Sequence, residues 1–125
     1  MLVTSTERTT LVTLTLNQRQ VGDVTIIDAS GTITLGRGAK LLSEGMRDLA
    51  TRGDKKILIN LAEVTYVDSC GIGELVSSLS GVANRGGSLK LLNPAKRIRD
   101  LLQITNLHTV FQVFDDEAAA VRSFA

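Results

Sequence analysis

The sequence is poor in the residues that build disulfides, metal sites and aromatic binding surfaces. Its 125 residues include one cysteine (Cys70), one histidine (His108), one tyrosine, three phenylalanines and no tryptophan. A single cysteine excludes an intramolecular disulfide, and one cysteine with one histidine leaves too few soft ligands for a structural zinc site. So few aromatic rings also provide no platform on which bases or sugars stack. We therefore expect neither a metal ion nor an organic cofactor.

The chain also lacks a large charge of either sign and a long apolar run. Its 14 Lys and Arg residues nearly balance its 13 Asp and Glu residues, for a formal net charge of +1. Such a balance disfavours non-specific binding to nucleic acids, which depends on a strong positive field. No stretch approaches the roughly 20 apolar residues that cross a bilayer, and the start of the chain lacks the basic and apolar regions of a signal peptide. The composition predicts one cytoplasmic domain without direct contact with nucleic acid or membrane.

What the sequence does contain is an alternation of strand and helix patterns. The threonine-rich residues 1–10 show no apolar period, so we interpret them as a flexible N-terminal arm that precedes a domain over residues 11–125. Apolar residues at every second position predict a strand around residues 12–16. Two further β-rich pieces are expected at 24–28 and 32–35, preceded by turns at Gly22-Asp23 and Ser30-Gly31.

Later in the chain the apolar spacing changes to three and four residues, which is the period of an amphipathic helix. Helices are predicted from Gly38 to near Gly53, over 72–83 until Gly86-Gly87, from an Asn93 N-cap with Pro94 in the first turn, and after Asp115–Glu117. Strands are predicted at 57–59, at 65–67 after a turn around Glu63, at 89–92 and at 110–114. The unbroken apolar run at 57–59 is typical of a strand covered on both faces. Strands that alternate with helices imply right-handed crossovers and a mostly parallel sheet.

The segment from Asp68 to Gly73 carries the chemistry that a partner or an enzyme could use. It places the hydroxyl of Ser69 beside a carboxylate at the start of a helix, and two glycines follow. Helix N-termini offer unpaired N–H groups and a partial positive charge, which would stabilise an anion on Ser69. Two interpretations stay open from the residues alone. Ser69 is either a site of modification or simply an N-cap, with Gly71 and Gly73 serving close packing.

From about Val21 to Phe124 the sequence resembles the STAS domain family, specifically the stand-alone bacterial anti-sigma factor antagonists. The order and spacing of several landmarks carry the resemblance: Gly31-Thr32-Ile33, Ile57 to Leu61, Asp68-Ser69-Cys70-Gly71-Ile72-Gly73, Gly86-Gly87 before Leu89, and Leu101-Leu102 through Thr105, Leu107 and Val110-Phe111. The resemblance implies an α/β domain in which about four helices pack mainly on one side of a mixed, mostly parallel sheet.

The resemblance also implies a regulatory binding protein without catalytic activity of its own. Ser69 would be the phosphoacceptor, and the partner-binding loop would comprise Asp68, Ser69, Cys70, Gly71, Ile72 and Gly73. The partner would be an anti-sigma factor that is also a serine kinase. It would be bound by the unphosphorylated protein, released on phosphorylation, and bound again after a serine phosphatase has acted. The protein itself would be a monomer or a weak dimer.

The sequence departs from the family pattern at three positions. Thr34 and Asn60 stand where many members have aspartate, so two acids expected near the phosphorylation loop are absent. Cys70 replaces the usual Ser or Thr beside the acceptor, which leaves Ser69 as the only hydroxyl of the loop. The details of kinase recognition are therefore expected to differ from those of other members.

Two other functional classes compete with this interpretation: a hydrolytic enzyme and a binding module without a phosphorylation switch. A hydrolytic triad of Ser69, His108 and Asp68 is disfavoured because the G-x-S-x-G elbow is absent and Asp68 adjoins the serine. His108 is expected on the surface or partly packed. Cys70 is more typical of a small buried cysteine than of a reactive thiol. A STAS scaffold or transport-accessory module without a phosphorylation switch remains the alternative within binding proteins.

Overall fold

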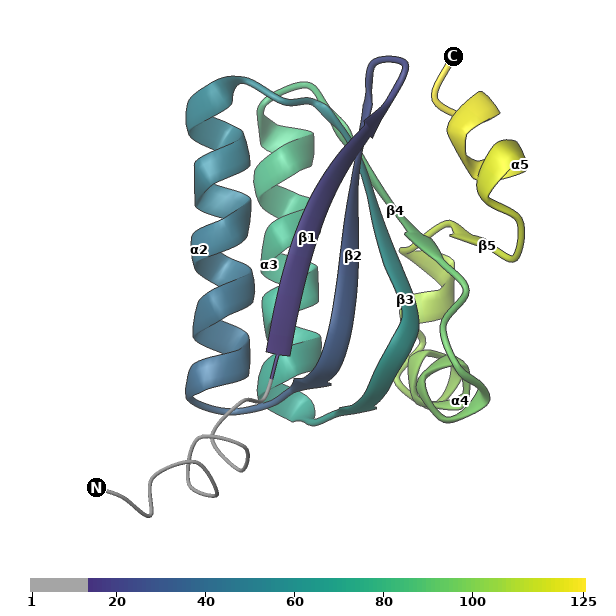
Figure 1. Ribbon diagram of the computed structural model, residues 1–125. Coiled ribbons are helices and arrows are strands. Elements are labelled where there is room, and N and C mark those ends of the chain that lie inside the picture. The colour runs from purple at the N-terminus through teal and green to yellow at the C-terminus, as the bar shows by residue number, and fades with distance from the viewer. Residues whose placement is uncertain (1–13) are drawn as a thin grey trace.

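The computed structural model describes residues 14–125, and the predicted arm over residues 1–10 lies outside them. Within the described residues one five-stranded sheet has the order β1-β2-β3-β4-β5 (Figure 1). Its strands are β1 (Leu14–Val21), β2 (Val24–Ile33), β3 (Lys56–Val67), β4 (Ser88–Leu92) and β5 (Val113–Phe114). β1 and β2 form an antiparallel hairpin, and the other neighbouring pairs are parallel. The prediction of a mixed, mostly parallel sheet is confirmed.

The helices divide unequally between the two faces of this sheet. They are α2 (Arg37–Arg52), α3 (Ser69–Asn84), α4 (Lys96–Ile104) and α5 (Glu117–Arg122), with a short 3-10 turn, η1 (Leu107–Thr109), after α4. α2 and α3 cover one face of the sheet and α5 the other (Figure 1). The buried residues of α4 belong to the same large core as those of α2 and α3. The predicted arrangement of helices mainly on one side is therefore confirmed, with α5 as the exception.

β3 occupies the middle of the sheet because its apolar residues serve both cores. Ile57 and Ile59 point into the core beneath α2 and α3, while Leu58 between them packs in the smaller core beneath α5. All three side chains are completely buried. At roughly 2 kcal/mol for a fully buried aliphatic side chain, this run alone contributes several kcal/mol to the hydrophobic stabilisation. It confirms the prediction of a strand covered on both faces.

Residues that favour helix ends set two of the predicted boundaries. α2 ends at Gly53, whose φ of 80° is in the left-handed region that glycine adopts without strain. α5 begins after Asp116, whose carboxylate accepts a hydrogen bond from the Ala119 N–H at 2.9 Å. Both boundaries agree with the sequence.

Two predicted turns are wrong, because both lie inside continuous strands. Ser30 and Gly31 belong to β2, and Glu63 belongs to β3. The register runs from Asp28 opposite Asn60 to Ser30 opposite Glu63, so β3 carries one more residue than β2 over this stretch. An extra residue in one strand is a β-bulge. It interrupts the alternation of apolar and polar residues by which a strand is predicted from sequence. The interruption resembled a turn.

The third helix and the last strand also begin later than predicted. Asn93 has a φ of 52° and is not an N-cap. Its N–H continues the sheet by donating to the Phe114 carbonyl, and α4 starts at Lys96 after Ala95. Asparagine favours both a helix N-cap and a left-handed turn, so the sequence alone did not separate the two. The strand expected from residue 110 is limited to Val113–Phe114 because η1 precedes it.

Candidate functional site

The segment with the candidate chemistry joins the end of β3 to the start of α3. Asp68, not Ser69, is the N-cap of α3, because its Oδ1 accepts a hydrogen bond from the Gly71 N–H at 2.9 Å. Its Oδ2 accepts a second one from the Leu35 N–H, also at 2.9 Å. The single carboxylate therefore fastens the start of α3 to the loop between β2 and α2. The interpretation of Ser69 as a simple N-cap is wrong.

These two contacts also determine the charge of Asp68. Hydrogen bonds from the main-chain N–H groups of Leu35 and then Gly71 favour the ionised form and lower the pKa of Asp68 below its ordinary value. Each carboxylate oxygen accepts one main-chain hydrogen bond, so Asp68 serves to fix the backbone of this turn. His108 lies on η1 with its side chain exposed, and no hydrogen bond joins it to Ser69 or Asp68 in the described part of the chain.

Ser69 and Cys70 both lie on the outside of the first turn of α3. Each is exposed, and the Ser69 hydroxyl has no hydrogen-bond partner among residues 14–125. The expectation of a small buried cysteine is wrong, because Cys70 is an exposed free thiol. The first turn therefore presents a hydroxyl that is fixed in position by the backbone while its own oxygen is free to react or to bind.

The two glycines of the loop have different roles. A Cβ at Gly71 would collide with the carbonyl oxygen of Ile33 and approach the side chain of Val67 to 2.8 Å. Nothing lies within 4 Å of the position that a Cβ would take at Gly73. Gly71 thus lets α3 pack on the end of β2, whereas Gly73 leaves the backbone open to an approaching molecule.

A groove of about 810 Å³ begins at Ser69 and runs between the end of β3 and α4. We call it the Ser69 groove and define it by residues from β3 (Tyr66, Val67), α3 (Ser69, Ile72) and α4 (Arg97, Ile104). The binding loop predicted from the sequence, residues 68–73, does not contain the α4 wall of this groove. One signal was present: Ile104 does not continue the buried stripe formed by Ile98 and Leu102, and its side chain is 82% exposed.

The described residues contain no group of three or more His, Cys, Asp or Glu side chains arranged to hold a metal ion. None of the helices within residues 14–125 is both long enough and apolar enough to span a membrane.

Comparison with known protein families matches residues 15–120 to the STAS domain. The chain belongs to the STAS domain family. This match confirms the resemblance that the sequence landmarks indicated, and within the described residues it covers all or part of every strand and helix, together with the Ser69 loop.

Individual relatives of this STAS domain are anti-sigma factor antagonists. The anti-sigma-B factor antagonist of Bacillus subtilis is 37% identical over 75 residues, which span 60% of this chain and 68% of the relative. A Thermotoga maritima structure provisionally described as an anti-sigma factor antagonist has a TM-score of 0.82 at 24% identity, covering 87% of this chain and 93% of that one. The Bacillus cell fate determinant SpoIIAA in its phosphorylated form has a TM-score of 0.70 at 18% identity, covering 89% and 100%. These two structures share the fold.

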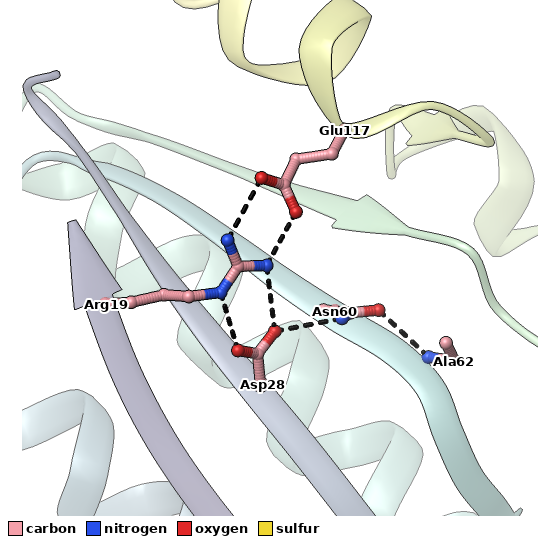
Figure 2. A network of polar contacts seen from close by, with 5 residues as sticks. All are labelled: Arg19, Asp28, Asn60, Ala62 and Glu117. Atoms are coloured by element: carbon pink, nitrogen blue, oxygen red, sulfur yellow. Dashed lines mark hydrogen bonds and ion pairs between the residues drawn. The ribbon is translucent and has the colours of Figure 1, made fainter. Parts of the chain in front are cut away.

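One of the two departures from the family's acidic pattern lies away from the loop. Asn60 donates from Nδ2 to Asp28 at 2.9 Å, within a network that also contains Arg19 and Glu117 (Figure 2). The stretch from Asn60 to Val67, the last residue of β3, pairs with Asp28 to Ile33 of β2, and five steps along a strand span about 17 Å. The expectation that an acid at position 60 would adjoin the Ser69 loop is wrong. Thr34 does adjoin the loop, because the next residue, Leu35, binds Asp68.

Proposed function

We propose that this STAS domain is an anti-sigma factor antagonist that Ser69 phosphorylation switches off. The unphosphorylated protein binds an anti-sigma factor in the bacterial cytoplasm and thereby frees a sigma factor. The bound anti-sigma factor is also the serine kinase, and a serine phosphatase restores the binding form. The binding loop comprises Asp68, Ser69, Cys70, Gly71, Ile72 and Gly73. The protein catalyses no reaction and requires no cofactor.

The observation that carries this proposal is the state of the Ser69 hydroxyl. It is exposed and has no hydrogen-bond partner in the described residues, while the adjacent Asp68 holds the backbone of the same turn rigid through two main-chain contacts. A kinase can therefore reach the hydroxyl without unfolding the domain. A structural serine at a helix start would instead use its oxygen to cap an N–H group.

A phosphate at this position would change the surface strongly without changing the core. It adds about −1.5 to −2 charges at neutral pH. The low pKa of Asp68 keeps a carboxylate ionised next to it, so the loop would hold two neighbouring anions. The partial positive charge that a helix carries at its N-terminus would favour a phosphate at the start of α3. A partner that fits the neutral hydroxyl would meet a larger, highly charged group.

The relatives support the two parts of the proposal separately. The Bacillus subtilis relative supports antagonism of an anti-sigma factor. The phosphorylated structure of the Bacillus protein supports the ability of this fold to carry a phosphate. Placing that phosphate on Ser69 of the present chain rests on the geometry described above.

The test is phosphopeptide mapping and intact mass of the full-length protein recovered from its native cell under several growth conditions. We expect a phosphate on Ser69 in some conditions and none in the Ser69→Ala variant. Ser77→Ala is the matched control, because Ser77 is also exposed on α3 but lies two turns away. We further expect Ser69→Ala to co-purify with an anti-sigma factor in every condition and Ser69→Asp to lose it.

A different outcome would favour the alternative function. If no phosphate is found in any condition while a stable partner co-purifies with both Ser69 variants, the protein is a scaffold or a transport-accessory module. A phosphate that persists in Ser69→Ala would instead move the switch to another residue.

A further inference from the structure

We propose that the Ser69 groove binds an apolar segment of the anti-sigma factor that carries a carboxylate placed against Arg97. This inference rests on the proposed function and specifies the surface and the chemistry of the partner. It adds to the loop a second contact region, on α4, that lies outside the binding loop predicted from the sequence.

The walls of the groove favour apolar side chains. Val67, Ile72 and Ile98 are buried and form its base. Tyr66 and Ile104 stand at its edge with 47% and 82% of their side chains exposed, and they are among the large apolar residues most exposed to solvent in the described chain. Large apolar residues gathered around a concave surface are typical of an interaction site. A partner segment that fills the groove would remove these side chains from water.

Four charged side chains line the groove, Asp68, Lys96, Arg97 and Asp100, and the carboxylate of Asp68 already accepts two main-chain hydrogen bonds. Lys96 is already paired with Asp100 at 2.8 Å, so its charge is largely compensated within the helix. Arg97 is exposed, lines the groove and makes no ion pair within residues 14–125. A guanidinium offers two parallel N–H donors to a carboxylate, which makes an Asp or Glu of the partner the matching group.

The same arrangement gives a physical reason for the switch. Ser69 lines the groove, so a phosphate on its hydroxyl would add negative charge beside the proposed acidic segment. Like charges repel, and the hydrated phosphate would also oppose the burial of apolar side chains next to it. Phosphorylation would thus weaken both contacts that the groove provides without moving α4.

The proposal can be tested by site-specific photocrosslinking of the full chain in its native cell. A p-benzoylphenylalanine residue replaces Ile104 in one protein and Ser77, on the exposed side of α3, in a second. A third protein carries it at Arg122, which is exposed on α5 over the other face of the sheet. Circular dichroism of each purified variant confirms that the fold is retained. Mass spectrometry identifies the crosslinked partner and its attached peptide.

We expect an adduct between position 104 and the anti-sigma factor, through a peptide that contains apolar residues and at least one Asp or Glu. Its yield is expected to fall about tenfold with Arg97→Glu, the loss expected when one well-placed interface contact is removed. Arg122→Glu, an equal charge reversal on α5, is expected to leave the yield unchanged. Ser69→Asp is expected to abolish the adduct.

Positions 104 and 77 separate failure of the groove from failure of the proposed function, and position 122, over the other face of the sheet, is expected to give no adduct with the anti-sigma factor. An adduct at position 77 but none at 104 would overturn the groove proposal and leave antagonism intact. Absence of the anti-sigma factor at both positions would contradict both. An adduct at 104 that is insensitive to Arg97→Glu, or whose peptide has no carboxylate, would overturn the electrostatic assignment.

Discussion

The start of α3 and the face beneath α5 are both held by polar contacts, but they use different parts of the chain. At α3 the contacts are main-chain N–H groups of Leu35 and Gly71 bound to one carboxylate. At α5 they join side chain to side chain. Arg19 binds Asp28 and Glu117, each at 2.6 Å, and thereby ties β1 and β2 to the first turn of α5 (Figure 2).

The C-terminal end of α5 is held by a second cation of the sheet, Lys90. Lys90 of β4 is 7% exposed, and its Nζ donates to the carbonyl oxygen and the hydroxyl of Ser123 at 2.9 and 2.8 Å. The ring of Phe124 lies 4.5 Å from the same ammonium group. A cation at a helix C-terminus is favourable, and burial without a carboxylate partner lowers the pKa of Lys90.

This difference separates the contacts that hold α5 from the surface at which we propose the switch. Around α5 the charged side chains are used in holding the helix, so few remain to meet a partner. At α3 the backbone provides the rigidity, and the side chains of Ser69, Cys70 and Leu35 remain exposed. A site built in this way tolerates a change of side-chain charge without loss of the fold, which is what a phosphorylation switch requires.

The largest effect on stability is expected at Gly71, where α3 packs directly against the backbone of β2. Gly71→Ala would press a methyl group against the Ile33 carbonyl, and we expect a loss of about 3 kcal/mol, near the upper end of overpacking costs. Gly73→Ala is the matched control. It is an exposed helical position with open space around it, and alanine there is expected to stabilise the helix by up to about 1 kcal/mol. Urea unfolding of both variants measures the difference. Equal stabilities for the two variants would contradict the assigned roles.

Much of this site was predictable because it depends on local sequence patterns. The helical period after Gly71 and the strand pattern at 65–67 placed the loop at the end of a strand and the start of a helix, as the structure has it. The identity of the N-cap was not predictable. Asp68 and Ser69 are adjacent, and both residue types cap helices well. The decision depends on Leu35, which lies 33 positions earlier and reaches Asp68 only in the folded chain.

The groove and the α5 network could not be predicted for a similar reason. Arg19 and Glu117 are 98 positions apart, and no periodic pattern relates them. The bulges of β3 shift its pairing with β2, so the neighbours of Asn60 follow from tertiary register and not from spacing. Exposed Ile104 gave a local signal, but only the position of α4 beside β3 turns that residue into one edge of a groove.

A smaller loss is expected when the α5 network is broken. Arg19→Met leaves the Asp28 and Glu117 carboxylates without their shared cation, and we expect the free energy of unfolding to fall by about 1 kcal/mol at pH 7, because more than a third of the arginine side chain is exposed and solvent screens the pair. Lys96→Met is the control for a more exposed ion pair and is expected to have no measurable effect. Urea unfolding at pH 7 and pH 3 tests both variants.

The pH dependence of this effect follows from the direction of the pKa shifts. Hydrogen bonds from Arg19 are the main cause of the lowered pKa of both Asp28 and Glu117. A carboxylate whose pKa is lower in the folded state stabilises the fold above its unfolded pKa, about 4, and loses that contribution as the pH falls. The difference between the wild type and Arg19→Met should therefore shrink from pH 7 to pH 3. A difference that grows in acid would rule out this assignment of the network.

The smallest effect on stability is expected at the residue with the largest proposed effect on function. Ser69→Ala removes an exposed hydroxyl that has no hydrogen-bond partner among the described residues, so the free energy of unfolding should change by less than about 0.5 kcal/mol, the usual range for such surface positions. Urea unfolding against the Ser77→Ala control measures this change. A loss above about 1 kcal/mol would be typical of a missing helix cap and would return Ser69 to a structural role. If the stability of Ser69→Ala is unchanged and this variant binds its partner in every growth condition, the backbone contacts of Asp68 alone maintain this turn. The hydroxyl is then available for regulation.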